Sequence, residues 1–201
     1  MVRAATVMVG AFLVMSPALA FMSPDSRPTA VDDPEAYAVY ASLLPHEWSV
    51  QVAHAKTLVF QEETGTNWDC MLTGKPLDED WRPVVDSLRS ENAKPRRIRA
   101  GFPLGMPYVV VPTADITASF RSLPNDPNFG WGGFYNRYPN SGGFMIVSAV
   151  GFDASKKRAM VYMAHSCGAL CAGGSHHLLE KVNGAWREAK VPGVFSCWWA
   201  S

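Results

Sequence analysis

Two pairs of β-type runs in the C-terminal third constrain the fold most. The second pair is joined by Asn183-Gly184, the dipeptide that most strongly favours a two-residue hairpin. The first pair is apolar and is joined by the polar turn 153–157. The pattern therefore predicts sequential antiparallel strands. The four runs are residues 144–152, 158–165, 176–182 and 185–191.

Helical patterns dominate the chain before these strands. Asp33 can cap a helix whose first position is Pro34, and apolar residues then recur at helical spacing until Pro45. A second helical stripe ends by Asn92, and two shorter helices follow it. These three patterns are the stripe Leu77, Trp81, Val84, Val85 and Leu88, the segment Thr113–Phe120, and the aromatic stripe Trp131, Phe134, Tyr135 and Tyr138.

Short β-type runs at Lys56–Gln61, Arg97–Ala100 and Tyr108–Val111 separate these helices. Helices that precede a series of sequential strands are typical of the α+β class. We therefore predict two or three N-terminal helices packed on an antiparallel meander sheet, stabilised by disulfides. This order resembles the cone-shaped nuclear-transport-factor-like domains, a fold that hosts both enzymes and passive binders.

Residues 1–20 have the features of a secretory signal peptide. Arg3 precedes the apolar run 4–15, and small residues stand at the cleavage positions within 18–20. The apolar run is shorter than the ~20 residues of a membrane span, and Pro17 follows it. We therefore expect cleavage after Ala20, no stable membrane anchor after cleavage, and an exported protein, periplasmic or extracellular.

The rest of the chain has the length of one domain. Residues 21–31 contain prolines and small polar residues without apolar periodicity, which predicts a flexible leader. Residues 32–201 show no repeat and no low-complexity segment, so we expect a single α+β domain there.

The charge balance excludes one class of partner. The chain has 18 Lys plus Arg and 18 Asp plus Glu, so its net charge is zero. Proteins that bind nucleic acids carry a strongly basic surface. We therefore expect a small ligand or a protein as partner, no nucleic acid, and no cofactor.

The cysteines are expected to be oxidised after export, and four cysteines permit three pairings. We favour Cys167–Cys171 with Cys70–Cys197. The first pair shares one Gly-rich loop, and the second would tie the C-terminal tail to the first half of the chain.

The densest group of reactive side chains is His165, Cys167, Cys171, His176 and His177. Imidazole and thiolate are ligands that zinc and copper prefer. A disulfide sulfur is not a thiolate, however, and adjacent strand residues point to opposite faces, so at most one of the paired histidines joins the cysteines. We favour a structural disulfide loop over a metal site or a redox-active pair, and keep His165 and His177 as alternative metal ligands.

Known catalytic motifs are incomplete in this chain. His46-Glu47 begins like the helix of a zinc protease, but Val50 stands where the second histidine is needed. Residues 173–175 lack the trailing glycine of a hydrolase elbow, and residues 130–133 lack the later lysine of a phosphate loop. These gaps argue against an enzyme.

Aromatic and acidic side chains supply the remaining binding candidates. Trp131, Tyr135 and the neighbouring Arg137 would form a platform for a carbohydrate or peptide if exposed, although core packing is the favoured interpretation of the aromatic stripe. Trp199 in the tail is a second aromatic candidate. Glu63 is a candidate for lining a cleft beside the first helix.

The segment 148–186 contains S-x-VGF, A-M-VY, CGxLC and LLEK-x-x-G-x-W. With these motifs the chain resembles a group of uncharacterised exported bacterial proteins. The segments YAVYASLL, VFQEET and FYNRYP and the Trp-Ala-Ser end extend the likeness over most of the chain. The resemblance implies export and one compact domain, but no activity, so it transfers no functional residue. His176 and His177 depart from it, because similar sequences have aromatic residues there.

We expect a secreted or periplasmic domain that binds a ligand or a protein without catalysis. The alternative is a metal-binding or hydrolytic enzyme centred on His165, Cys167, Cys171, His176 and His177.

Overall fold

The computed structural model describes residues 28–47, 55–65, 79–101, 103, 107–191 and 198–200. In chain order its elements are α1 (Pro34–Glu47), β1 (Thr57–Gln61), the 3-10 helix η2 (Glu79–Trp81), α2 (Arg82–Glu91), β2 (Tyr108–Val111), α3 (Thr113–Phe120), α4 (Trp131–Arg137), β3 (Ser141–Val147), β4 (Gly151–Phe152), β5 (Arg158–Gly168), β6 (Cys171–Val182), β7 (Ala185–Glu188) and β8 (Trp198–Ala200).

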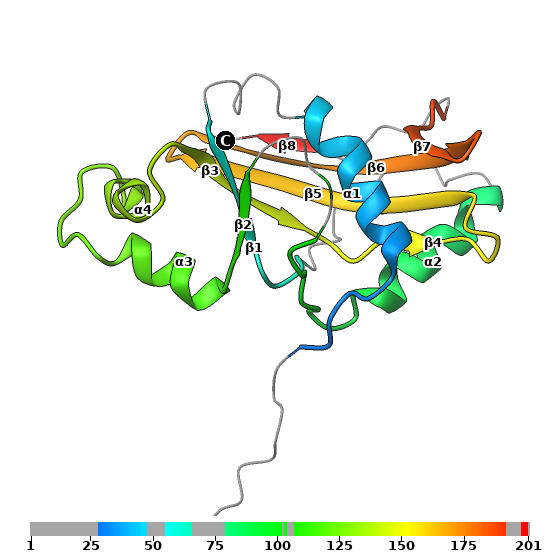
Figure 1. The fold of residues 1–201 in the computed structure, drawn as a ribbon, viewed down its shortest axis with the longest axis horizontal. Helices are drawn as coiled ribbons and strands as arrows, with labels where there is room; N and C mark the ends of the chain where they lie inside the picture. The colour runs from blue at the N-terminus through cyan, green and yellow to red at the C-terminus, as the bar shows by residue number, and fades with distance from the viewer. Residues whose placement is uncertain are drawn as a thin grey trace, which may run out of the picture.

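The strands form one sheet that is covered by helices on both faces (Figure 1). Its order is β2-β1-β3-β5-β6-β7, with β4 paired to β5 and β8 paired to β6. Helix α1 packs on one face. Helix α2 packs on the other face beside Met160 and Leu178, and α3 and α4 pack there beside Val59 and Phe144. The α+β class is confirmed, whereas the nuclear-transport-factor-like cone is not.

The predicted meander is right only for part of the sheet. Strands β3, β5, β6 and β7 are antiparallel neighbours, but β1 runs parallel to both β2 and β3. Parallel neighbours need long crossover connections. Here α2 lies in the connection from β1 to β2, and α3 and α4 lie in the connection from β2 to β3. The run Arg97–Ala100 is not a strand, because only Arg97 pairs, in isolated bridges to Ala30 and Glu63.

The turn between β6 and β7 confirms the hairpin prediction. Val182 pairs with Ala185, and both turn residues have positive φ, 51° at Asn183 and 81° at Gly184. This conformation matches the right-handed twist of the flanking strands. The register that it sets continues to the pair of Leu179 with Glu188.

Helix α1 begins as predicted. The Asp33 carboxylate accepts the backbone N–H of Glu35 at 3.0 Å, and Pro34 occupies the first turn, where its missing N–H costs nothing. The helix extends past Pro45 to Glu47, so the predicted end was too early.

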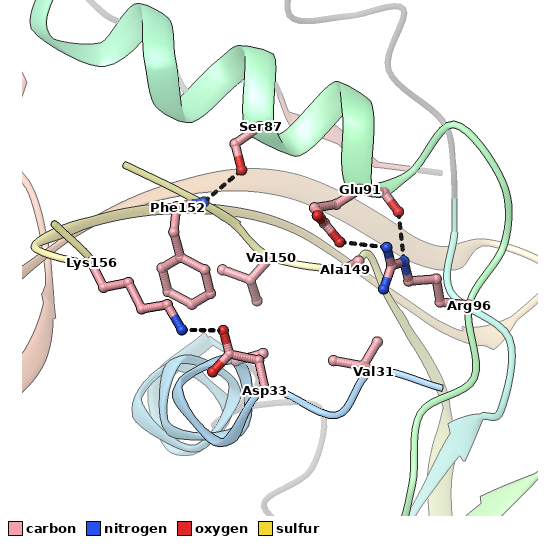
Figure 2. Close-up of a pocket in the computed structure, with 10 residues that line it drawn as sticks. Val31, Asp33, Ser87, Glu91, Arg96, Ala149, Val150, Phe152 and Lys156 are labelled. Atoms are coloured by element: carbon pink, nitrogen blue, oxygen red, sulfur yellow. Dashed lines mark hydrogen bonds and ion pairs between the residues drawn. The ribbon is translucent and has the colours of Figure 1, made fainter. Parts of the chain in front are cut away.

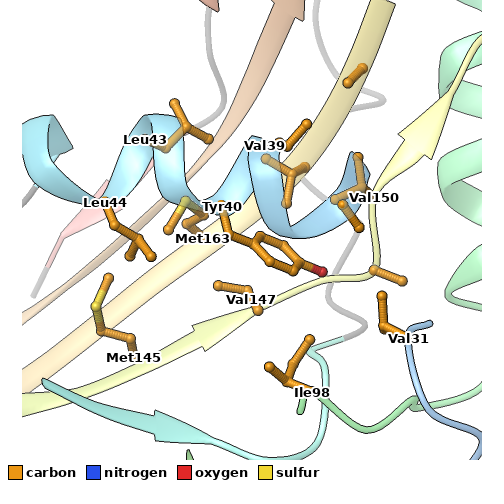
Figure 3. Packing of buried hydrophobic residues seen from close by; sticks show 14 of the residues in the cluster. Val31, Val39, Tyr40, Leu43, Leu44, Ile98, Met145, Val147, Val150 and Met163 are labelled. Carbon is orange, nitrogen blue, oxygen red and sulfur yellow. The ribbon is translucent and has the colours of Figure 1, made fainter. Parts of the chain in front are cut away.

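The main core lies between α1 and the sheet (Figure 3). Tyr40 is buried there, and its hydroxyl donates to the Ser148 carbonyl at 2.8 Å. Burial raises the pKa of this phenol. The hydroxyl therefore stays protonated and fixes α1 above the sheet. Its apolar neighbours include Val39, Leu43, Leu44, Met145, Val147 and Met163.

Backbone pairing begins earlier than the predicted domain start at residue 32. The N–H of Val31 donates to the Arg97 carbonyl at 2.8 Å, the N–H of Arg97 donates to the Thr29 carbonyl at 2.9 Å, and Val31 is buried. The packed unit therefore includes the end of the predicted leader 21–31. The predicted signal peptide lies outside the described residues.

Cys167 and Cys171 form a disulfide, as predicted, with their Cα atoms 5.1 Å apart. It closes the tight turn between β5 and β6. The predicted partners Cys70 and Cys197 lie outside the described residues. In the described part of the chain, every helix is too short or too polar to cross a lipid bilayer.

Candidate functional site

A pocket of about 330 Å³ lies between the start of α1, helix α2 and the segment that includes β4 (Figure 2). This volume is at the lower end of the range of small-molecule sites. The lining residues are Val31, Asp33, Ala36, Ser87, Glu91, Arg96, Ala149, Val150, Phe152 and Lys156.

The middle of the pocket is apolar. Val31, before α1, and Ala36, in its first turns, line one side. Ala149, Val150 and Phe152 line the other from the segment around β4. Figure 2 shows that the side chains of Val150 and Phe152 lie between two charged ends. A ligand in this pocket would bury its apolar body against them and gain hydrophobic stabilisation.

Each end of the pocket carries one positive and one negative side chain. Lys156 and Asp33 lie 2.7 Å apart at one end. Arg96 and Glu91 lie 2.7 Å apart at the other end, and the Arg96 Nε also donates to the Glu91 carbonyl at 3.1 Å. All four charges are partly exposed, so water weakens both pairs and a charged ligand group can compete for either partner.

A buried amide holds the wall of the pocket in place. Asn92, 1% exposed, follows α2 and donates from Nδ2 to the carbonyls of Leu88 at 2.8 Å and Ala149 at 3.0 Å. Its Oδ1 accepts the Ala149 N–H at 2.7 Å. In addition, the Ser87 hydroxyl accepts the Phe152 N–H at 3.1 Å. The pocket is therefore shaped by hydrogen bonds before any ligand enters.

The aromatic candidates on α4 do not form an exposed platform. Trp131 is 8% exposed and packs with Phe134 against β1 and β3, so the core interpretation is confirmed for both. Tyr135 is half-buried, and its hydroxyl donates to the Cys167 carbonyl at 2.8 Å. Arg137 pairs with Asp115 at 3.0 Å on the surface. The helix buries its aromatic stripe because one apolar face must cover the sheet.

Glu63 lies outside the pocket lining, and Trp199 lies in the C-terminal strand β8. Glu63 follows β1 and forms a backbone bridge with Arg97, while its carbonyl accepts the Gln61 amide at 2.9 Å. Trp199 lies in β8, opposite Gly174 of β6, and its side chain is outside the described residues. The pocket lining includes none of Glu63, Trp131, Tyr135 and Arg137.

The histidine and cysteine group is divided by the sheet. Both sulfurs are taken by the disulfide. His165 donates to the Gly142 carbonyl, and burial lowers its pKa. His176 packs against the ring of Tyr162, and burial, aided by the neighbouring His177, lowers its pKa to about 4. Both rings are therefore neutral at pH 7.

Within the described residues, no group of three or more His, Cys, Asp or Glu side chains is placed to hold a metal ion. His165 and His177, the alternative metal ligands, each have a protein partner. The described residues therefore give no geometric support for the metal alternative.

The structure adds a polar cluster that the sequence analysis did not assemble. His177 contacts Ser175 through Nε2 at 2.8 Å and Glu188 through Nδ1 at 2.7 Å. The spacing Ser-x-His, with Ser175 directly before the predicted strand 176–182, was the available signal for the first contact. The second contact depends on the register between β6 and β7.

The sequence did not predict the residues that line the pocket. Of these residues only Asp33 was singled out, as the cap of the first helix. The lining residues come from four separate stretches of the chain: 31–36, 87–96, 149–152 and Lys156. Comparisons with known proteins give no assignment: no family model, no curated protein and no solved structure matches the chain.

Proposed function

We propose that this chain is an exported domain that binds a small zwitterionic molecule in the pocket between α1 and α2. The observation that carries the proposal is the combination of an apolar middle with one ion pair at each end. The proposal is one of binding without turnover at this pocket.

Charge pairing at both ends favours a ligand that carries both signs. A carboxylate at one end would meet Lys156 or Arg96, and an ammonium group at the opposite end would meet Glu91 or Asp33. A ligand with a single charge would form an ion pair at one end only and would leave the pair at the other end without a charged ligand group. An amino acid or betaine whose ammonium and carboxylate groups are separated by an apolar chain satisfies both ends.

Two features support export. The sequence of residues 1–20 predicts a cleaved signal peptide, and the disulfide at Cys167–Cys171 is typical of oxidising compartments. The resemblance to exported bacterial proteins points the same way. Mass analysis of the full chain after expression in a bacterial host should find an exported form that begins at Phe21. Recovery of only the uncleaved chain inside the cell would contradict export.

Ligand binding is tested with saturation-transfer NMR and titration calorimetry on a panel of free amino acids and betaines. The critical variant is Lys156→Glu, with Lys157→Glu as its matched control, because Lys157 lies beside it but does not line the pocket. We expect at least one panel member to bind saturably and Lys156→Glu to weaken it by about tenfold or more. Binding that is equal in both variants, or no saturable binding, would refute the proposal.

The hydrolytic alternative is favoured by a different observation, the contacts of His177 with Ser175 and Glu188, and does not involve the pocket.

A further inference from the structure

Ser175, His177 and Glu188 are linked in the order nucleophile, base and carboxylate. We infer that they form a serine nucleophile site that accepts an acyl group from a short-chain carboxylic ester. The three residues are separate from the lining of the ligand pocket, so this inference does not depend on the proposed binding function.

Strand geometry places the three side chains on one face of the sheet. Ser175 and His177 are two residues apart on β6, and alternate residues of a strand share a face. Glu188 lies on β7 directly opposite Leu179, the next residue of that face. The face is the one covered by α1, because Leu179 belongs to the core cluster with Val39 and Tyr40.

The hydrogen-bond partners of His177 favour the tautomer that a general base needs. The Glu188 Oε1 accepts the Nδ1–H of His177 at 2.7 Å. The lone pair of Nε2 is then available to accept the hydroxyl of Ser175, at 2.8 Å. A carboxylate that orients the imidazole through Nδ1, with a serine at Nε2, is the arrangement that activates a serine hydroxyl.

Burial strengthens these contacts without closing the site. His177 is 5% exposed, so its hydrogen bonds lie in a medium of low dielectric constant. Ser175 is only partly buried and the Glu188 side chain is 54% exposed, so the cluster reaches solvent at both ends. Met163 and Val161, the cross-strand partners of Ser175 and His177, are fully buried and apolar. This apolar surrounding favours a small apolar acyl group.

The reaction passes through an acyl-serine intermediate. The Ser175 Oγ forms a bond to the carbonyl carbon of the ester while its proton passes to the His177 Nε2. The bond from that carbon to the alkoxy oxygen then breaks, and the alkoxide leaves with the proton from Nε2. Water attacks the acyl-serine in the same way and releases the carboxylic acid, which restores the serine. Glu188 acts as a positioning residue, because it contacts the imidazole of His177 through Nδ1 and acts on the serine through that ring.

The test uses the full disulfide-bonded chain and a fluorophosphonate probe. Reaction forms a bond from the Ser175 oxygen to phosphorus and releases fluoride with the serine proton. We expect peptide mass analysis to find one adduct per chain, on Ser175. Ser175→Ala should abolish it, whereas Ser166→Ala, a matched control on β5, should react like the wild type.

The base and the positioning residue are tested by labelling rates. We expect His177→Asn to slow labelling by about 100-fold or more, and Glu188→Gln by about tenfold or more. Glu188→Asp keeps a carboxylate and should recover part of the rate, which a purely structural role of Glu188 would not predict. Circular dichroism verifies that each variant is folded.

Hydrolysis of p-nitrophenyl acetate is the second readout, and it should be lost in Ser175→Ala. Absence of a Ser175 adduct on the folded wild type, or equal labelling rates in His177→Asn and the wild type, would overturn the inference. Lys156→Glu should label like the wild type, so failure of the binding proposal and failure of this one are distinguishable.

Discussion

Replacing Asn92 by alanine should lower the free energy of unfolding by about 3 kcal/mol. Asn92 is 1% exposed, and its amide makes three hydrogen bonds that join the end of α2 to the backbone of Leu88 and Ala149. Its removal therefore separates a helix from the segment that forms one wall of the ligand pocket.

The three bonds do not contribute equally. After the change the Leu88 carbonyl still accepts the backbone N–H of residue 92, and the Ala149 carbonyl still accepts the Ser148 hydroxyl. The N–H of Ala149 loses its side-chain acceptor in a buried position, which costs about 1–3 kcal/mol. The other two bonds add roughly 0.5–1 kcal/mol each.

Equilibrium unfolding in urea, followed by tryptophan fluorescence, measures the effect. Asn136→Ala, on the exposed side of α4, is the control and should change the free energy of unfolding by less than about 0.5 kcal/mol. A loss below about 1 kcal/mol for Asn92→Ala, at an unchanged slope with urea, would refute the reasoning.

Three further predictions concern the sheet and its turns. Gly143→Ala should prevent folding or severely destabilise the folded state. Gly143 has a φ of 96°, and an added Cβ would collide with the Ser166 carbonyl. Soluble yield and melting temperature measure the effect. Acid should lower the free energy of unfolding by up to about 3 kcal/mol between pH 6.5 and pH 4. In the folded protein His176 has a pKa of about 4, so as the pH falls the unfolded chain takes up the proton first. In His176→Phe the urea midpoint should depend less on pH over this range. Replacing Cys167 and Cys171 by alanine should cost about 2 kcal/mol, as expected for a short closed loop, and a urea midpoint equal to that of the wild type would contradict this.

Local elements could be predicted from the sequence where one short signal decides them. The Asn183-Gly184 turn and the Asp33 cap are such signals, and both are present in the structure. The segments Tyr108–Val111 and Thr113–Phe120 were predicted with the observed boundaries. In each case the relevant interactions lie within a few residues of one another.

The order of the sheet could not be predicted in this way. Strand β1 lies between β2 and β3 and runs parallel to both, with helices in the connections. The apolar pattern of a strand does not encode the direction of its partner. The burial of Val31, at the end of the predicted leader, could not be predicted either. Its hydrogen-bond partner Arg97 is far away in the chain.

The candidate sites likewise combine features that the local sequence predicts with features that depend on tertiary contacts. The sequence by itself determined the class of the fold, the Asn183-Gly184 hairpin and the Asp33 cap, and it favoured the disulfide at Cys167–Cys171 among three possible pairings, because these depend on local conformation and on short loops. Only the tertiary structure decided that Trp131 is buried, that the pocket has a charge pair at each end, and that Glu188 lies beside His177. These contacts join residues whose proximity arises from strand register and helix packing, which act between segments and not within them.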